Sequence, residues 1–143
     1  MSLGENLTNV RKRIAGAADR VGRDPSEIRI VAITKTHPPA TVEEAASMGL
    51  RDVGENKVQE FLEKSEKIAA DCRWHLVGHL QRNKVKKIIN RFELIHSLDS
   101  IRLARELNKR SLREEIATDV LVQVNTSGED SKYGIEQDDA VRF

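Results

Sequence analysis

Lys35 is the residue of this sequence best placed for covalent chemistry. It directly follows an apolar run at residues 30–34 and precedes a turn at residues 36–39 that contains two prolines. A lysine held against a low-dielectric core has a lowered pKa, and its neutral amine can attack an aldehyde to form a Schiff base. The alternative is a snorkelling lysine at a strand end, whose ammonium stays in water. Position alone leaves both interpretations open.

Polar side chains also follow the other predicted strands. Asn56 and His79 follow two of them within three residues, Asn125 stands at the end of the last, and Lys132 lies in the loop beyond it. Ligands of parallel α/β folds bind at the carboxyl ends of the strands, so these residues could surround Lys35. For Asn125 the alternative is a turn cap, and for Lys132 a solvated loop lysine.

The elements that must position these residues begin with a helix. Apolar residues spaced by three and four predict a helix over residues 3–21, which ends at Gly22 and Pro25. The six residues of this apolar stripe are Leu3, Leu7, Val10, Ile14, Ala17 and Val21. A coiled coil is the alternative, but fewer than three heptads is short for one.

Strands and helices then alternate along the rest of the chain. Strands are predicted at residues 28–34, 52–53, 74–77, 92–96 and 119–125. The first connecting helix is predicted over residues 41–48, with a capping box of Thr41 and Glu44. Helices between successive strands predict a parallel sheet with right-handed crossovers, in one domain over residues 1–143. Periodicity leaves a doubly wound sheet and a (βα)8 barrel as alternatives.

Composition excludes several classes of protein. Lys and Arg total 24 against 23 Asp and Glu, which argues against a polybasic nucleic-acid binder. Cys72 is the only cysteine, so one chain cannot form a disulfide framework. No apolar run is long enough for a membrane helix and no secretory signal is visible, so a cytoplasmic location is expected.

Two further patterns are weak signals for function. His75 and His79 are four residues apart, like two zinc ligands on a helix, but Gly78 lies between them and the segment is typical of a strand and loop. The basic run at residues 82–91 has no aromatic interleaving, which favours a solvated helix face over a nucleic-acid site.

Five motifs together resemble the pyridoxal phosphate homeostasis proteins. They occur in the family's order over about residues 29–135. The motifs are VAITKTHP at 31–38, GENKVQE at 54–60, WHLVGHLQRNK at 74–84, IHSLD at 95–99, and VQVN at 122–125 with SKYGI at 131–135.

The resemblance implies a fold like the N-terminal domain of alanine racemase, a (βα)8 barrel preceded by a helix. Here the expectation is a partial barrel: the N-terminal helix and about five βα units of a C-terminally truncated member. The resemblance also implies pyridoxal 5′-phosphate (PLP) held as a Schiff base on Lys35, with Asn56 lining the cofactor pocket. The implied role is vitamin B6 homeostasis without established catalysis, and the alternative is a PLP-dependent amino-acid racemase. Client apo-enzymes are conceivable partners.

The family's phosphate-binding loop and late strands find no counterpart in these 143 residues. A phosphate dianion requires several backbone N–H donors. We therefore expect PLP binding by this chain to be weakened or lost. We also expect exposed edges at the first and fifth strands, and with them self-association.

Overall fold

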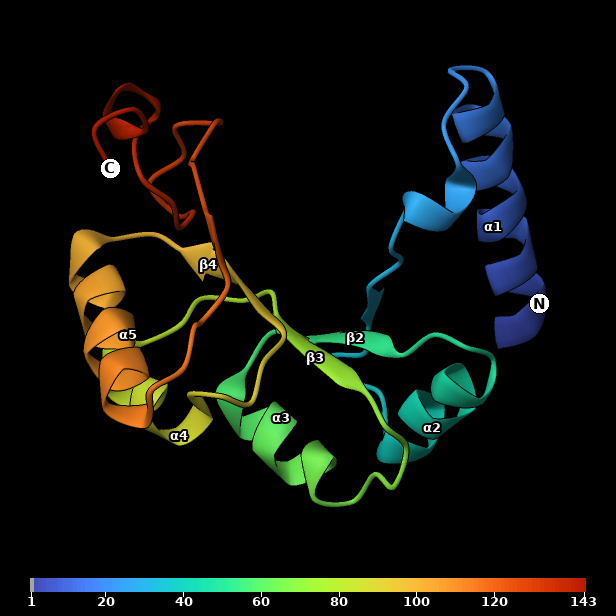
Figure 1. Cartoon of the computed structure of the whole chain (residues 1–143), viewed down its shortest axis with the longest axis horizontal. Coiled ribbons are helices and arrows are strands. Elements are labelled where there is room, and N and C mark those ends of the chain that lie inside the picture. The colour runs from blue at the N-terminus through green and yellow to red at the C-terminus, as the bar shows by residue number, and fades with distance from the viewer. Residues whose placement is uncertain (1) are drawn as a thin grey trace.

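The chain folds around one parallel sheet in a computed structural model that describes residues 2–143 (Figure 1). Its five strands pair in their sequence order. They are β1 (Ala32–Ile33), β2 (Asp52–Glu55), β3 (Arg73–Leu76), β4 (Leu94–Leu98) and β5 (Val120–Val122). Every neighbouring pair is parallel, so the predicted βα organisation is confirmed.

The helices between the strands decide between the two architectures that the sequence left open. They are α2 (Pro39–Ser47), α3 (Val58–Ser65), α4 (Val85–Ile88) and α5 (Ile101–Glu114). All four lie on the same side of the sheet, along the lower side of Figure 1. A doubly wound fold has helices on both faces and a reversal of strand order, and neither occurs here. The fold is therefore a partial (βα) barrel, with short 3₁₀ turns η1 (Pro25–Glu27), η2 (Arg82–Lys84) and η3 (Gln137–Asp139).

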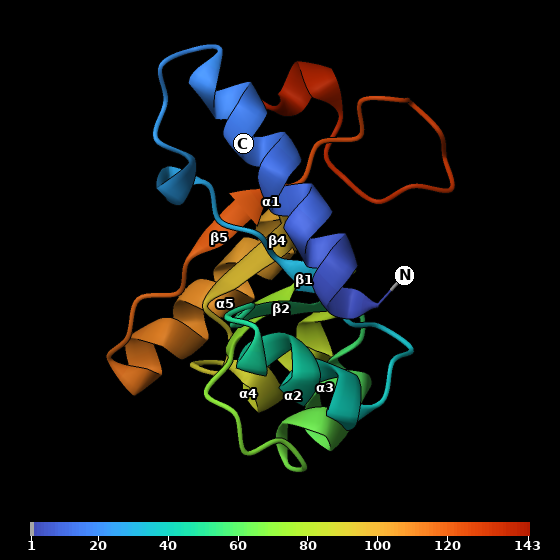
Figure 2. The same ribbon diagram turned by 90° about the vertical axis from the view of Figure 1, so that its right-hand side faces the viewer.

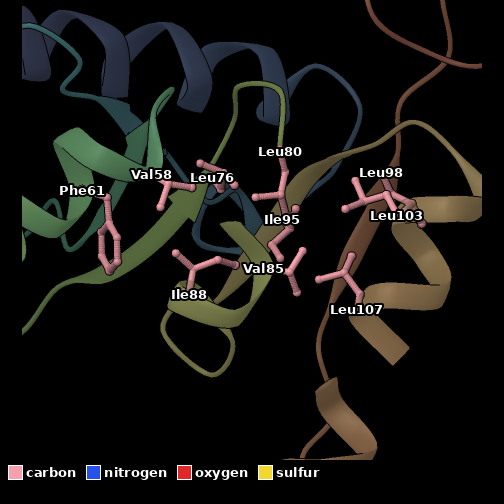
Figure 3. Packing of buried hydrophobic residues seen from close by; sticks show 10 residues of the cluster. All are labelled: Val58, Phe61, Leu76, Leu80, Val85, Ile88, Ile95, Leu98, Leu103 and Leu107. Carbon is pink, nitrogen blue, oxygen red and sulfur yellow. The ribbon is translucent and has the colours of Figure 1, made fainter. Parts of the chain in front are cut away.

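Aliphatic side chains of the sheet and of α3–α5 form the main core (Figure 3). Phe61 of α3 supplies the largest of these side chains and is 1% exposed. Its ring lies 5.2 Å from Trp74 at 71° and 4.3 Å from Phe92 at 43°. Edge-to-face and tilted aromatic pairs of this kind add to the hydrophobic gain from burial.

Helix α1 (Leu3–Asp19) lies across the β1 end of the sheet (Figure 2). Ser2 caps it through a capping box with Glu5. Leu7 packs with Ala45 and Leu50 in a second, smaller cluster. Only part of the predicted apolar stripe of this helix is buried against the rest of the protein, because Val21 lies beyond the end of α1 and is 75% exposed.

Several predicted boundaries were wrong. Helix α2 begins at Pro39 without a side-chain cap, so the Thr41 capping box does not form. A proline at the first helical position has a suitable fixed φ and loses no helical hydrogen bond, which explains the earlier start. The first strand spans two residues rather than seven, because its ladder with β2 pairs only Ala32 and Ile33.

The two faces of the sheet differ. Ala32 packs toward α1 and α2. A β-carbon added to Gly54 would meet side-chain atoms of Val31, Ile33 and Val77, so these four residues share the opposite face. We call this the inner face, because it would point toward the axis of a closed barrel. Ile33 on this face is 47% exposed.

Candidate functional site

Lys35 stands at the carboxyl end of β1, as predicted. Its side chain is exposed, whereas Thr34 before it is buried. Of the two interpretations left open by the sequence, this exposure agrees with a lysine at a strand end whose ammonium stays in water, and not with one held against the core. Strand β1 is an outer strand with one neighbour, and the chain leaves the sheet at Thr34 in a turn closed by the His37 N–H. Thr36 in this turn has φ +66°, a left-handed conformation that a non-glycine residue rarely adopts.

Asn56 and His79 come together at the carboxyl ends of β2 and β3. Both line a cavity of about 460 Å³, together with residues of α3 and η2. Gly78 lets the two strand ends approach, since a β-carbon there would lie 2.2 Å from the Asn56 carbonyl oxygen. The sequence correctly predicted that polar residues after neighbouring strands gather at one edge of the sheet.

His79 is oriented from two sides. Its Nδ1 lies 2.8 Å from Oδ2 of Asp99, which follows β4. Its ring stacks on Tyr133 with centroids 3.8 Å apart and planes 9° from parallel. The loop after β5 is therefore attached to the ends of β3 and β4. This contact was not predicted, because it depends on how a long loop folds back.

Asn125 and Lys132 belong to that same loop. The Asn125 amide donates to the Glu129 carbonyl at 3.0 Å, and its Oδ1 accepts from the Gly128 N–H at 3.1 Å. Asn125 thus acts as a turn cap here. Lys132 is exposed and pairs with the Glu129 carboxylate at 2.6 Å.

His75 does not join His79. It lies in β3 on the inner face, where Nε2 is 3.0 Å from Asp52 Oδ1 and Nδ1 is 2.9 Å from His96 Nε2. Burial and the neighbouring His75 lower the pKa of His96. Among residues 2–143, no group of three or more His, Cys, Asp or Glu side chains is placed to hold a metal ion.

A buried ion cluster behind Lys35 was missed by the sequence analysis. Lys64 of α3 is 6% exposed and pairs with Glu55 and Glu60, each at 2.7 Å. The signal for it was present, because Lys64 follows Val58 and Phe61 at helical spacing on the apolar side of α3. A charged residue in that stripe must be paired.

Consecutive βα units in one curved sheet, with polar side chains at the carboxyl ends of the strands, define the N-terminal part of a (βα) barrel. The chain belongs to the family of the alanine racemase N-terminal domain, whose model matches residues 6–143.

Curated relatives and solved structures agree with this assignment. The chain is 43% identical over 137 residues to the pyridoxal phosphate homeostasis protein of Aquifex aeolicus, covering 95% of this chain and 60% of the relative. An uncharacterised protein from Bifidobacterium adolescentis superposes with a TM-score of 0.86 at 34% identity, covering 97% of this chain and 61% of that one. PipY of Synechococcus elongatus with PLP bound gives 0.72 at 33% identity, covering 89% and 58%.

The chain spans about 60% of the length of the curated relatives it matches. None of the helices over residues 2–143 has the length and apolar character needed to cross a membrane.

Proposed function

We propose that this chain is a PLP-binding protein of vitamin B6 homeostasis, with the Lys35 amine as the group that captures the cofactor's aldehyde. The observation that carries the proposal is the placement of Lys35. It is an exposed amine at the carboxyl end of β1, on the same edge of the sheet as Asn56 and His79. The names of the curated relatives and the PLP-bound structure of PipY support the same ligand.

The residues present suit an aldehyde with a polar ring. Lys35 would hold the aldehyde carbon covalently through its amine, with release of one water. Within residues 2–143, Lys35 forms no ion pair, so its amine is not occupied by a carboxylate. Asn56 offers an amide to the cavity that it lines with His79. PLP, when bound, supplies an electron-withdrawing ring.

The phosphate group of PLP has less support in this chain. Phosphate sites of (βα)8 barrels lie after strands 7 and 8, whereas the described residues form five strands. We therefore propose that this chain binds PLP more weakly than its longer relatives, mainly through Lys35.

Titration with PLP tests the proposal. The visible band of an imine should appear on adding PLP to the 143-residue chain and should be lost in Lys35→Ala. Lys67→Ala is the control, because Lys67 is also an exposed lysine but lies after α3. An equal band in Lys35→Ala would refute the assignment of the anchor.

A racemase-like enzyme is the second candidate, favoured by the pairing of His79 with Asp99. A PLP-dependent racemase needs proton donors and acceptors on opposite faces of the cofactor. A histidine held by a carboxylate is suited to that role. Formation of D-amino acids from L-amino acids by the PLP-loaded protein would support this candidate.

The remaining predictions concern partners and location. We propose PLP-dependent apo-enzymes as recipients, no nucleic-acid partner and a cytoplasmic location. We also propose self-association through β1 and β5, the outer strands of the sheet. A single monomeric species in sedimentation at all concentrations would contradict that last point.

A further inference from the structure

The ammonium of Lys64 lies beneath the turn that carries Lys35. Its side chain is 7% exposed. A lysine ammonium has three N–H donors, and the structure gives each one an acceptor. Nζ donates to the Thr34 carbonyl oxygen at 2.6 Å and to carboxylate oxygens of Glu55 and Glu60 at 2.7 Å each.

The cluster holds the backbone on both sides of Lys35. On one side, Thr34 offers its carbonyl to Lys64 and donates its hydroxyl to Glu55 at 2.6 Å. On the other side, the Thr36 N–H donates to Glu60. Thr34 and Thr36, the two neighbours of Lys35, are thus held by side chains of β2 and α3.

The turn needs such support because of its conformation. Thr36 has φ +66°, which is disfavoured for a β-branched residue and persists only where surrounding contacts impose it. The bond from its N–H to Glu60 is one of those contacts. Backbone strain next to a functional residue is a known way of holding that residue in place.

Lys64 itself is unsuited to capture an aldehyde. Burial lowers the pKa of Lys64, but the hydrogen bonds that it donates to Glu55 and Glu60 outweigh that effect and leave the pKa raised. The amine therefore stays protonated and cannot act as a nucleophile. The two lysines therefore differ in access: Lys35 is exposed, while Lys64 is buried and ion-paired.

We propose that Lys64, with Glu60, is a positioning residue for Lys35: the ion cluster fixes the turn at Thr34 and Thr36, and so sets where the Lys35 amine meets the aldehyde. The inference rests on the proposed function. It adds that the reaction of Lys35 depends on α3, even if no residue of α3 touches the cofactor.

Two variants test the proposal through PLP labelling of Lys35, trapped by borohydride and quantified by peptide mass spectrometry. Glu60→Ala removes the acceptor for the Thr36 N–H at a partly exposed helix position where alanine is a good helix former. Its matched control is Glu63→Ala, which removes the same charge from the same helix, where the carboxylate accepts a hydrogen bond from Gln59 and, among residues 2–143, takes no part in the cluster. The double variant Lys64→Met with Glu55→Gln removes both charges of the buried pair, and the carboxylate that remains, Glu60, is partly exposed to solvent.

We expect the rate of Lys35 labelling to fall about tenfold in Glu60→Ala and further in the double variant, since a misplacement of about 1 Å can cost up to a hundredfold. Labelling of exposed Lys109 on α5, far along the chain from the cluster, should not change in the same samples, which separates positioning from general loss of structure. The inference would be overturned if Glu60→Ala kept an unchanged circular dichroism spectrum and its Lys35 were labelled as fast as in Glu63→Ala. A wild-type chain without any labelling at Lys35 would instead refute the proposed function itself.

Discussion

His75 and Asp52 are joined by a 3.0 Å contact between Nε2 and Oδ1 on the inner face of the sheet, one strand apart. Arg73 binds the same carboxylate at 2.9 and 2.6 Å. The bond from Arg73 lowers the pKa of Asp52 to about 2, against the opposing effect of burial, with a further contribution from His75. Asp52 is 4% exposed, whereas the Arg73 side chain is 47% exposed, so solvent reaches this pair from the arginine side.

This depressed pKa predicts a particular loss of stability in acid. A carboxyl with a lower pKa in the folded state stabilises the fold above its unfolded pKa of 3.8, and the stability is lost as pH falls toward 2. Asp52→Asn should therefore cost about 2 kcal/mol at pH 7 and much less at pH 2, measured by urea unfolding. Asp71→Asn, in an exposed pair with Arg51, is the control and should change stability by less than about 0.5 kcal/mol. An equal loss for Asp52→Asn at both pH values would contradict the assignment.

Gly78 should be intolerant of any side chain. A β-carbon there would lie 2.2 Å from the Asn56 carbonyl oxygen, and backbone atoms cannot yield as a flexible side chain can. Gly78→Ala should lower the free energy of unfolding by about 2 kcal/mol or more and alter the cavity beside His79. Gly16→Ala is the reference, because a β-carbon in the middle of α1 meets nothing within 4 Å. It should stabilise the chain by about 0.5–1 kcal/mol, and comparable destabilisation by both changes would be inconsistent with the structure.

Tyr133 should hold the loop after β5 against His79. Loss of the stack in Tyr133→Ala should cost about 0.5–1.5 kcal/mol of local stability. Amide exchange in residues 126–134 should accelerate accordingly, by several-fold, when followed by mass spectrometry. Tyr133→Phe keeps the ring and should exchange like the wild type. Unchanged exchange in Tyr133→Ala would mean that the loop is held by other contacts, such as the Asn125 cap.

The sequence predicted the order and direction of the strands better than the boundaries of the strands and helices. Alternation of apolar runs and helices was sufficient for parallel order, because a strand–helix–strand unit has few alternatives. It could not distinguish a barrel from a doubly wound sheet, since that choice depends on which face each crossover helix covers. Pro39 also misled the prediction of α2, because the same residue can stop a strand and start a helix.

For the candidate site, the sequence was sufficient to predict which residues lie at the same edge of the sheet. Asn56 and His79 do meet, as residues after neighbouring parallel strands should. The choice between an exposed and a core-held Lys35 could not be made from the sequence, because it depends on β1 being an outer strand of the sheet. The partnership of His75 with Asp52 and His96 required the strand register, which no local pattern in the sequence specifies.

Borohydride reduction of the chain in excess PLP, followed by peptide mass spectrometry, tests the identity of the anchor most directly. Reduction converts a C=N bond to a stable secondary amine, so the modified residue can be read from the peptide mass. We predict that the peptide containing Lys35 carries the adduct at a higher yield than any other lysine-containing peptide. Labelling spread evenly over the exposed lysines, or concentrated on Lys132, would contradict the account.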